Sequence, residues 1–237
     1  MRAVSMEALN TLLSSYRDVP IHMHIAEQQK EVRDCLDAFK LPPVAHLLSF
    51  VDVNANWCLI HATHMKPFEV TDLASTGAVV GLCPTTEGNL GDGFFELRHY
   101  LAERGAFGIG SDSNASRSPF EELRFLEYSQ RLKHQERNIS AGLVGSSGET
   151  LYSKALAGGA QALGQKVGQI KLGYGADLLL LDSEHPQLIG HKTDHLLDAL
   201  IFSGTETPIK QIMVAGKWLS PEKYQPEFGK VLKHLKD

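Results

Sequence analysis

Short apolar runs alternate with segments of helical periodicity from about residue 3 to residue 168, and this alternation constrains the fold most strongly. Strands that are buried on both faces have such apolar runs. A repeated strand and helix predicts parallel strands with crossover helices. The pattern alone leaves a barrel and an open doubly wound sheet as equal alternatives. The expected strands cover residues 19–25, 57–62, 77–83 and 106–112, with helices at 5–16, 28–39 and 67–75.

The pattern changes after about residue 168. The segments 168–182 and 209–219 are rich in β-forming residues and contain glycine turns, which predicts a hairpin or a small sheet. The end of the chain has the pattern of an exposed amphipathic helix. We therefore expect a βα region at 1–167, a small β region at 168–220 and a C-terminal helix at 221–237.

Charge and apolar content narrow the class of partner. The net charge is −5 at pH 7 and no basic run could form a phosphate-binding stripe, so a nucleic-acid partner is not expected. No apolar run approaches the length of a membrane span, and Met1 is not followed by a signal-peptide pattern. Three widely spaced cysteines fit reduced thiols better than a disulfide framework. These features predict a cytoplasmic protein with no membrane partner.

The first expected strand contains two histidines and is followed by a glutamate, in the sequence PIHMHIAEQ at 20–28. His22 and His24 are two residues apart, so they face the same side of the strand. In a parallel barrel the residue nearer the C-terminal end of the strand lies at the mouth, where active sites form. We therefore predict His24 as a metal ligand, Glu27 as a general acid or base, and His22 as a hydrogen-bonded core histidine.

Two further strand ends carry similar residues. His61 closes the apolar run in CLIHATH, and His64 lies beyond it in the following loop. Asp112 follows the run AFGIGS, although aspartate is also common in turns for structural reasons. The C-terminal ends of parallel strands converge in space, so we expect these side chains to meet those of the first strand. Nitrogen and carboxylate ligands suit a single divalent metal, with zinc expected and iron as the alternative.

These residues resemble the amidohydrolase superfamily, in particular its deaminase-like branch with a single metal. The resemblance implies that His24 and Asp112 bind the metal and that Glu27 shuttles protons. It implies that His61 contacts the substrate and the bound water, and that Asp112 also takes a proton from the attacking water. The expected fold is thus α/β, a partial TIM-like (β/α) barrel containing the last four βα units.

Within the superfamily, four segments are most similar to the formimidoylglutamate deiminase group: HIAEQQKEV, WCLIHATH, CPTTEGNLGDG and GIGSDSN. The resemblance implies hydrolysis of N-formimino-L-glutamate to N-formyl-L-glutamate and ammonia in histidine degradation. The implied partner is a small-molecule substrate, and the complete enzyme could form a homodimer. The segment from 158 to 219 resembles the C-terminal part of the small β-sandwich that accompanies such barrels.

The resemblance also implies that part of the enzyme is missing from this chain. The family's H-x-H metal motif belongs to the first barrel strand, whereas HMH at 22–24 matches the fifth. Four βα units cannot close an eight-stranded barrel of about 250 residues. We therefore expect the C-terminal portion of a longer enzyme, with weak metal binding, an exposed edge strand and no activity alone.

The substrate-binding residues are less defined by the sequence. A dicarboxylate substrate calls for arginine forks, and Arg2 is the candidate that the resemblance suggests, with Arg117 and Arg124 as further candidates near Asp112. Asn89 and Asp92 lie in a long glycine-containing loop and are expected to have a structural role.

Two other functions fit the same sequence. One is an amidohydrolase-type deaminase of guanine or another cyclic amidine, which would need aromatic stacking positions in place of paired arginines. Aromatic residues are scarce near the strand ends, and this favours formiminoglutamate. The other is a non-catalytic fragment or half-barrel that needs a partner chain, which the absence of an upstream H-x-H motif would explain.

Overall fold

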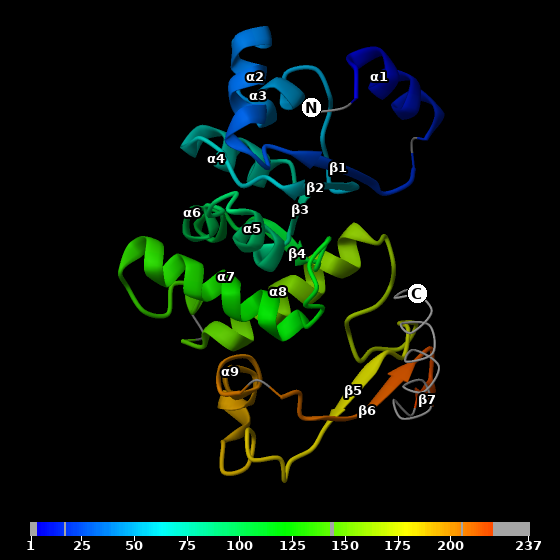
Figure 1. The fold of residues 1–237 in the computed structure, drawn as a ribbon. Coiled ribbons are helices and arrows are strands. Elements are labelled where there is room, and N and C mark those ends of the chain that lie inside the picture. Colours follow the sequence, from blue (N-terminus) through cyan, green and yellow to red (C-terminus); the bar gives the residue numbers. More distant parts are fainter. Residues whose placement is uncertain (1–3, 17, 143–144, 205, 220–237) are drawn as a thin grey trace, which may run out of the picture. The chain divides into compact units, whose positions relative to one another are not determined.

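The computed structural model describes residues 4–16, 18–142, 145–204 and 206–219 (Figure 1). The chain divides into two compact units, Met1–Gln165 and Lys166–Asp237. The helix expected at 221–237 lies outside the described residues. Within the described residues, no helix is long and apolar enough to cross a membrane.

The first unit contains a sheet of four parallel strands, whose order in space is their order along the chain (Figure 1). Each strand pairs with the next one and is joined to it by at least one helix. This arrangement is that of a partial (β/α) barrel, as predicted, and it is not an open doubly wound sheet. The strands are β1 (Ile21–Ile25), β2 (Trp57–His61), β3 (Val79–Leu82) and β4 (Ala106–Ile109).

Eight helices accompany this sheet in the described residues of the first unit. Several begin with a proline in the first turn, where its missing N–H costs nothing. Ser118 and Ser146 cap α7 and α8 by accepting hydrogen bonds from the backbone N–H groups of Glu121 and Glu149. The helices are α1 (Met6–Ser15), α2 (Gln29–Phe39), α3 (Pro43–Leu48), α4 (Pro67–Ser75), α5 (Pro84–Leu90), α6 (Leu97–Ala102), α7 (Pro119–His134) and α8 (Ser147–Ala162).

The two faces of the sheet are covered differently. One face carries the fully buried side chains of Leu59, Val80 and Phe107. On the opposite face, Cys58 and Val79 pack against Ala162 of α8. The helix α8 therefore closes part of the face to which His22 and His24 belong.

A glycine permits the close contact between α8 and the sheet. A Cβ added at Gly158 would lie 2.0 Å from the carbonyl oxygen of Phe107, so no side chain fits there. At the end of the same helix, the Ala162 carbonyl oxygen lies 2.8 Å from Nε2 of His22. His22 is hydrogen-bonded, as predicted, but it is exposed and is not a core residue. The reason is that β1 is the outer strand of this sheet and, within the described residues, pairs on one side only.

The second unit contains a three-stranded antiparallel sheet of order β5-β6-β7, which agrees with the small β region expected from the sequence. Every residue of these three strands is half-buried or exposed. Asp177 holds the turn between β6 and β7, because its Oδ1 accepts the N–H of Ala215 over 2.7 Å. The elements are β5 (Leu178–Leu181), the 3₁₀ helix η2 (Thr193–His195), α9 (Leu196–Phe202), β6 (Ile209–Val214) and β7 (Lys217–Leu219).

Candidate active site

His61 ends β2 with a backbone conformation that the apolar run does not predict. It pairs with Ile25, while His24 pairs with Ile60, so regular alternation would point the two histidines to opposite faces. Instead, His61 has φ of 70° and Ala62 has φ of 47°. These left-handed values redirect the chain, and the ring centroids of His24 and His61 lie 5.5 Å apart. Left-handed backbone at residues other than glycine is strained and clusters at functional sites.

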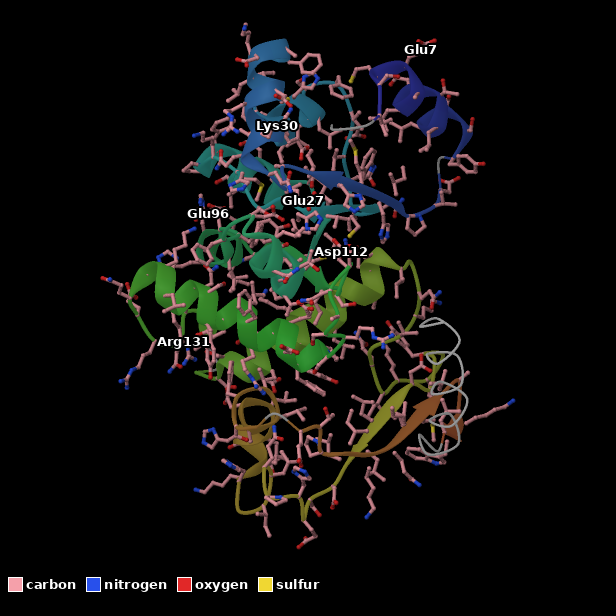
Figure 2. The ribbon with its side chains drawn as sticks, viewed as in Figure 1. Glu7, Glu27, Lys30, Glu96, Asp112 and Arg131 are labelled. Carbon is pink, nitrogen blue, oxygen red and sulfur yellow. The ribbon has the colours of Figure 1, made fainter. Side chains whose placement is uncertain are left out.

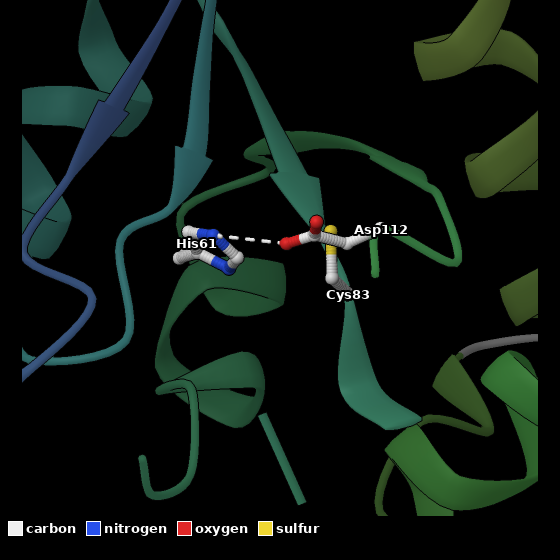
Figure 3. Close-up of side chains that lie close together, drawn as sticks. All are labelled: His61, Cys83 and Asp112. Atoms are coloured by element: carbon white, nitrogen blue, oxygen red, sulfur yellow. Dashed lines mark ion pairs between the residues drawn. The ribbon is translucent and has the colours of Figure 1, made fainter. Parts of the chain in front are cut away.

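Three carboxylates surround the imidazole ring of His61, which is fully buried. Its Nε2 lies 3.6 Å from Oδ2 of Asp112 and 3.8 Å from Oε1 of Glu27. Its Nδ1 lies 3.3 Å from Oε1 of Glu87. Figure 3 shows the ring of His61 and the carboxylate of Asp112 pointing toward one another. The structure therefore brings together the three residues predicted to be catalytic, Glu27, His61 and Asp112.

Glu27 lies just beyond β1, in a loop that another glutamate holds. The residue is 5% exposed, and Figure 2 labels it in the same part of the first unit as Asp112. The backbone N–H groups of Ala26 and Glu27 donate to Oε1 and Oε2 of Glu31, over 3.0 and 3.2 Å. Glu31 thus fixes the backbone from which Glu27 reaches His61.

Asp112 lies beyond β4 and has a left-handed backbone as well, with φ of 48°. Its side chain is 28% exposed, so it is the most accessible of the carboxylates around His61. Ser113 donates a hydrogen bond to its Oδ1 over 3.1 Å, and the other oxygen, Oδ2, faces His61. The hydroxyl of Thr86 donates to the carbonyl oxygen of Ser111 over 2.8 Å and anchors the loop to α5.

Glu87 was not predicted from the sequence. It lies in the first turn of α5, directly after β3, and is 3% exposed. Its Oε1 also accepts the backbone N–H of Cys83 over 3.0 Å. A carboxylate soon after a buried strand could have suggested a role, because Glu27 follows the first strand in the same way. The sequence does not show that Glu87 points back toward the strand end.

The potential metal ligands form a different group from the predicted pair. Within the described residues, His61, Cys83 and Asp112 offer ligand atoms that all lie within 4.8 Å of one another (Figure 3). His24 does not belong to this group. Its side chain is exposed, on the outer strand β1.

Burial and charge act in opposite directions on His61. Burial disfavours the charged ring, but the hydrogen bond and charge of Glu87, with the charges of Glu27 and Asp112, outweigh it and raise the pKa of His61. Burial is also the main reason that the pKa of the Cys83 thiol is raised well above its usual range, with a contribution from Glu87. Cys83 is therefore a neutral thiol near neutral pH in the absence of a metal.

The residues present are chemically suited to a divalent metal. Nε2 of His61 is buried and has no hydrogen-bond partner in the described structure. Buried polar atoms are normally satisfied, so this nitrogen faces a position for a further group. Imidazole nitrogen from His24 and carboxylate oxygen from Asp112, both at strand ends, are the donor types that zinc and ferrous iron accept.

The remaining candidates from the sequence are Arg2, Arg117, Arg124, Asn89 and Asp92. Arg2 lies outside the described residues. Arg117 and Arg124 are described, and both have interactions with other groups. Asn89 is exposed, whereas Oδ2 of Asp92 is buried and has no partner in the described structure.

His64 completes the loop after β2. Its Nδ1 lies 2.9 Å from Nε2 of Gln29, and its backbone N–H donates to the carbonyl oxygen of Ala26. Both contacts connect the loops after β1 and β2, so His64 holds the two strand ends together.

Comparison with known proteins gives consistent results. Residues 3–219 match the model of the amidohydrolase family. The chain is 48% identical over 221 residues to formimidoylglutamate deiminase of Pseudomonas aeruginosa, a match that covers 92% of this chain and 49% of the relative. The chain therefore spans about half the length of this relative.

Solved structures agree at the level of the fold. The crystal structure of an amidohydrolase from Brucella melitensis has a TM-score of 0.89 and 41% identity, over 99% of this chain and 53% of that one. An adenosine deaminase from Xanthomonas campestris, solved with bound zinc, has a TM-score of 0.79 and 22% identity, over 97% of this chain and 54% of that one. The second likeness concerns the fold alone.

Proposed function

The chain belongs to the amidohydrolase family, and on this premise we propose that its protein hydrolyses N-formimino-L-glutamate to N-formyl-L-glutamate and ammonia. The observation that carries the proposal is the convergence of Glu27 and Asp112 on Nε2 of His61. Two carboxylates and an imidazole around one buried point can move the protons of a hydrolysis. The substrate is proposed from the similarity to formimidoylglutamate deiminase.

We propose that one divalent metal, zinc or alternatively iron, is held by His24 and Asp112 together with ligands from outside this chain. Such an ion lowers the pKa of water towards neutrality and so supplies hydroxide. Two ligands are fewer than the three protein ligands typical of catalytic zinc sites. The chain alone should therefore bind the metal weakly and be inactive.

The residues of the chain then divide the proton transfers among them. Asp112 accepts a proton from the attacking water at Oδ2, the oxygen nearest to His61. His61 stabilises the charge that develops as the C–O bond forms at the formimino carbon. Glu27 delivers a proton to the imino nitrogen and takes one back from the hydroxyl group of the tetrahedral centre as the C=O bond forms. It passes that proton to the departing ammonia as the C–N bond breaks, and the proton held by Asp112 then returns to Glu27.

The two carboxylates of the substrate need cationic partners. We propose Arg2, Arg117 and Arg124 as candidates, because guanidinium groups bind carboxylates in a bidentate manner. A soluble cytoplasmic enzyme of histidine degradation is the corresponding biological role, and a homodimer is a further proposal for the complete enzyme.

The test is ammonia release from N-formimino-L-glutamate by the full-length, metal-loaded protein, with guanine as the parallel substrate. Asp112→Ala should abolish the release, whereas Asp72→Ala, at an exposed position of α4, should leave it unchanged. Release from guanine alone would retain the site and overturn the substrate. Release from neither substrate by a folded, metal-loaded protein would overturn the proposed activity and favour a non-catalytic role.

A further inference from the structure

We propose that Glu87 is a positioning residue, which holds His61 by Nδ1 and so aims Nε2 at the point between Glu27 and Asp112. The effect on catalysis rests on the proposed function, but the placement of the ring does not. Glu87 comes from α5, whereas His61 comes from the end of β2, so two separate elements meet at this contact.

The contact is buried on both sides. His61 is fully buried and Glu87 is 3% exposed, and Oε1 of Glu87 lies 3.3 Å from Nδ1 of the ring. The same oxygen accepts the backbone N–H of Cys83 over 3.0 Å, which fixes the carboxylate against the end of β3. The carboxylate can therefore not swing away without leaving a buried N–H group unsatisfied, which is costly.

The chemistry of the contact selects one form of the ring. A carboxylate can only accept, so Nδ1 of His61 must carry the hydrogen of this bond. In the neutral ring, Nε2 then carries no hydrogen, whereas in the charged ring it presents an N–H group to Asp112 and Glu27. A hydrogen bond at one ring nitrogen commonly determines the state of the other, and a carboxylate that holds one nitrogen of a histidine also orients its ring.

A second buried glutamate serves as a control that separates the positioning role of Glu87 from a purely structural one. Glu122 of α7 is 2% exposed and accepts the N–H and hydroxyl of Thr85 over 2.9 and 2.5 Å. Glu122 thus holds α5 at Thr85, which lies two residues before Glu87 on the same helix. Glu122→Leu should disturb α5 without changing which nitrogen of His61 carries a hydrogen.

Three substitutions at Glu87 distinguish the geometry of the contact from its charge. Glu87→Gln retains an oxygen at the place of Oε1 and should preserve the hydrogen on Nδ1. Glu87→Asp retains the charge, but withdraws the oxygen by one methylene and should lose the contact. Glu87→Leu removes both features. Glu87→Asp also serves as the test if the leucine variant does not fold.

The first measurement is ¹⁵N NMR of histidine-labelled, metal-free protein at one alkaline pH at which the His61 ring is neutral in every variant, with the His61 signal assigned from His61→Asn. We expect a hydrogen on Nδ1 in the wild type, in Glu87→Gln and in Glu122→Leu, and its loss in Glu87→Asp and Glu87→Leu. A hydrogen on Nδ1 that persists in Glu87→Asp would overturn the proposal. So would a wild-type ring without a hydrogen on Nδ1.

The second measurement is ammonia release by the full-length, metal-loaded variants. Glu87→Asp should lower kcat by about 10- to 100-fold with little change in KM, because the loss of a carboxylate that orients a histidine ring typically has an effect of this size. A kcat equal to that of the wild type would overturn the catalytic part of the proposal. If NMR gives the expected result but the wild type releases no ammonia, the positioning role stands and the proposed function fails.

Discussion

The first two strands of the parallel sheet both end near a histidine, yet the two side chains have different surroundings. His24 is on the outer strand β1 and is exposed, whereas His61 is on the inner strand β2 and is fully buried. Three carboxylates surround His61, from the segments that follow β1, β3 and β4. The segments that follow the neighbouring strands, rather than the sequence around the histidine itself, therefore place His61 among charged groups.

Substitution of either histidine should cause a large loss of activity, so activity should not distinguish the two. His24→Asn and His61→Asn in the full-length protein should each lower kcat by about 10²- to 10⁴-fold, because the first is a proposed ligand and the second a proposed catalytic group. The measurement is ammonia release from N-formimino-L-glutamate. Full activity of His24→Asn would end the assignment of the exposed histidine to the site.

Stability should distinguish them clearly. His61→Asn removes the ring from among buried carboxylates and should lower the free energy of unfolding by about 3–5 kcal/mol, since breaking a buried charged pair is costly. His24→Asn is at an exposed position and should change it by less than about 0.5 kcal/mol. Urea denaturation of the two metal-free variants measures the difference. Equal losses in the free energy of unfolding would show that the buried contacts of His61 contribute little to stability.

The face that carries His24 is partly closed by α8, and two adjacent glycines test this contact. Gly158→Ala would place a Cβ against the Phe107 carbonyl and should destabilise the protein by about 1–3 kcal/mol. Gly159→Ala meets nothing within 4 Å and should stabilise the helix by about 0.5–1 kcal/mol. Thermal unfolding of both variants gives the comparison, and the same sign for both would contradict the observed packing.

The last prediction concerns the reactivity of Cys58 and needs no substitution. Cys58 lies level with His22 in the sheet, but on the inner strand, and burial raises the pKa of its thiol to about 11. The reactive thiolate should therefore be scarce at pH 8 and increase as the pH rises towards 11. Alkylation of the native protein with iodoacetamide, followed by mass spectrometry, measures this dependence. Rapid labelling of Cys58 at pH 8 would show that this face is open to solvent.

The class of the fold can be predicted from local sequence. Buried strands and amphipathic helices have different apolar periods, so the alternation before residue 168 could predict parallel strands with crossover helices. It also located Glu27, His61 and Asp112, because polar residues that end buried apolar runs are recognisable without any coordinates. These are properties of local sequence, and local sequence is sufficient for them.

The contacts among these residues depend on the tertiary structure. The left-handed backbone at His61 and Ala62 brings the ring to the side of His24, against the alternation of the strand. The approach of Glu87 to Nδ1 depends on the packing of α5 beneath the end of β2, and the exposure of His24 depends on the place of β1 at the edge of the described sheet. Backbone turns and contacts between distant segments depend on the sum of many weak interactions, which no short stretch of sequence encodes.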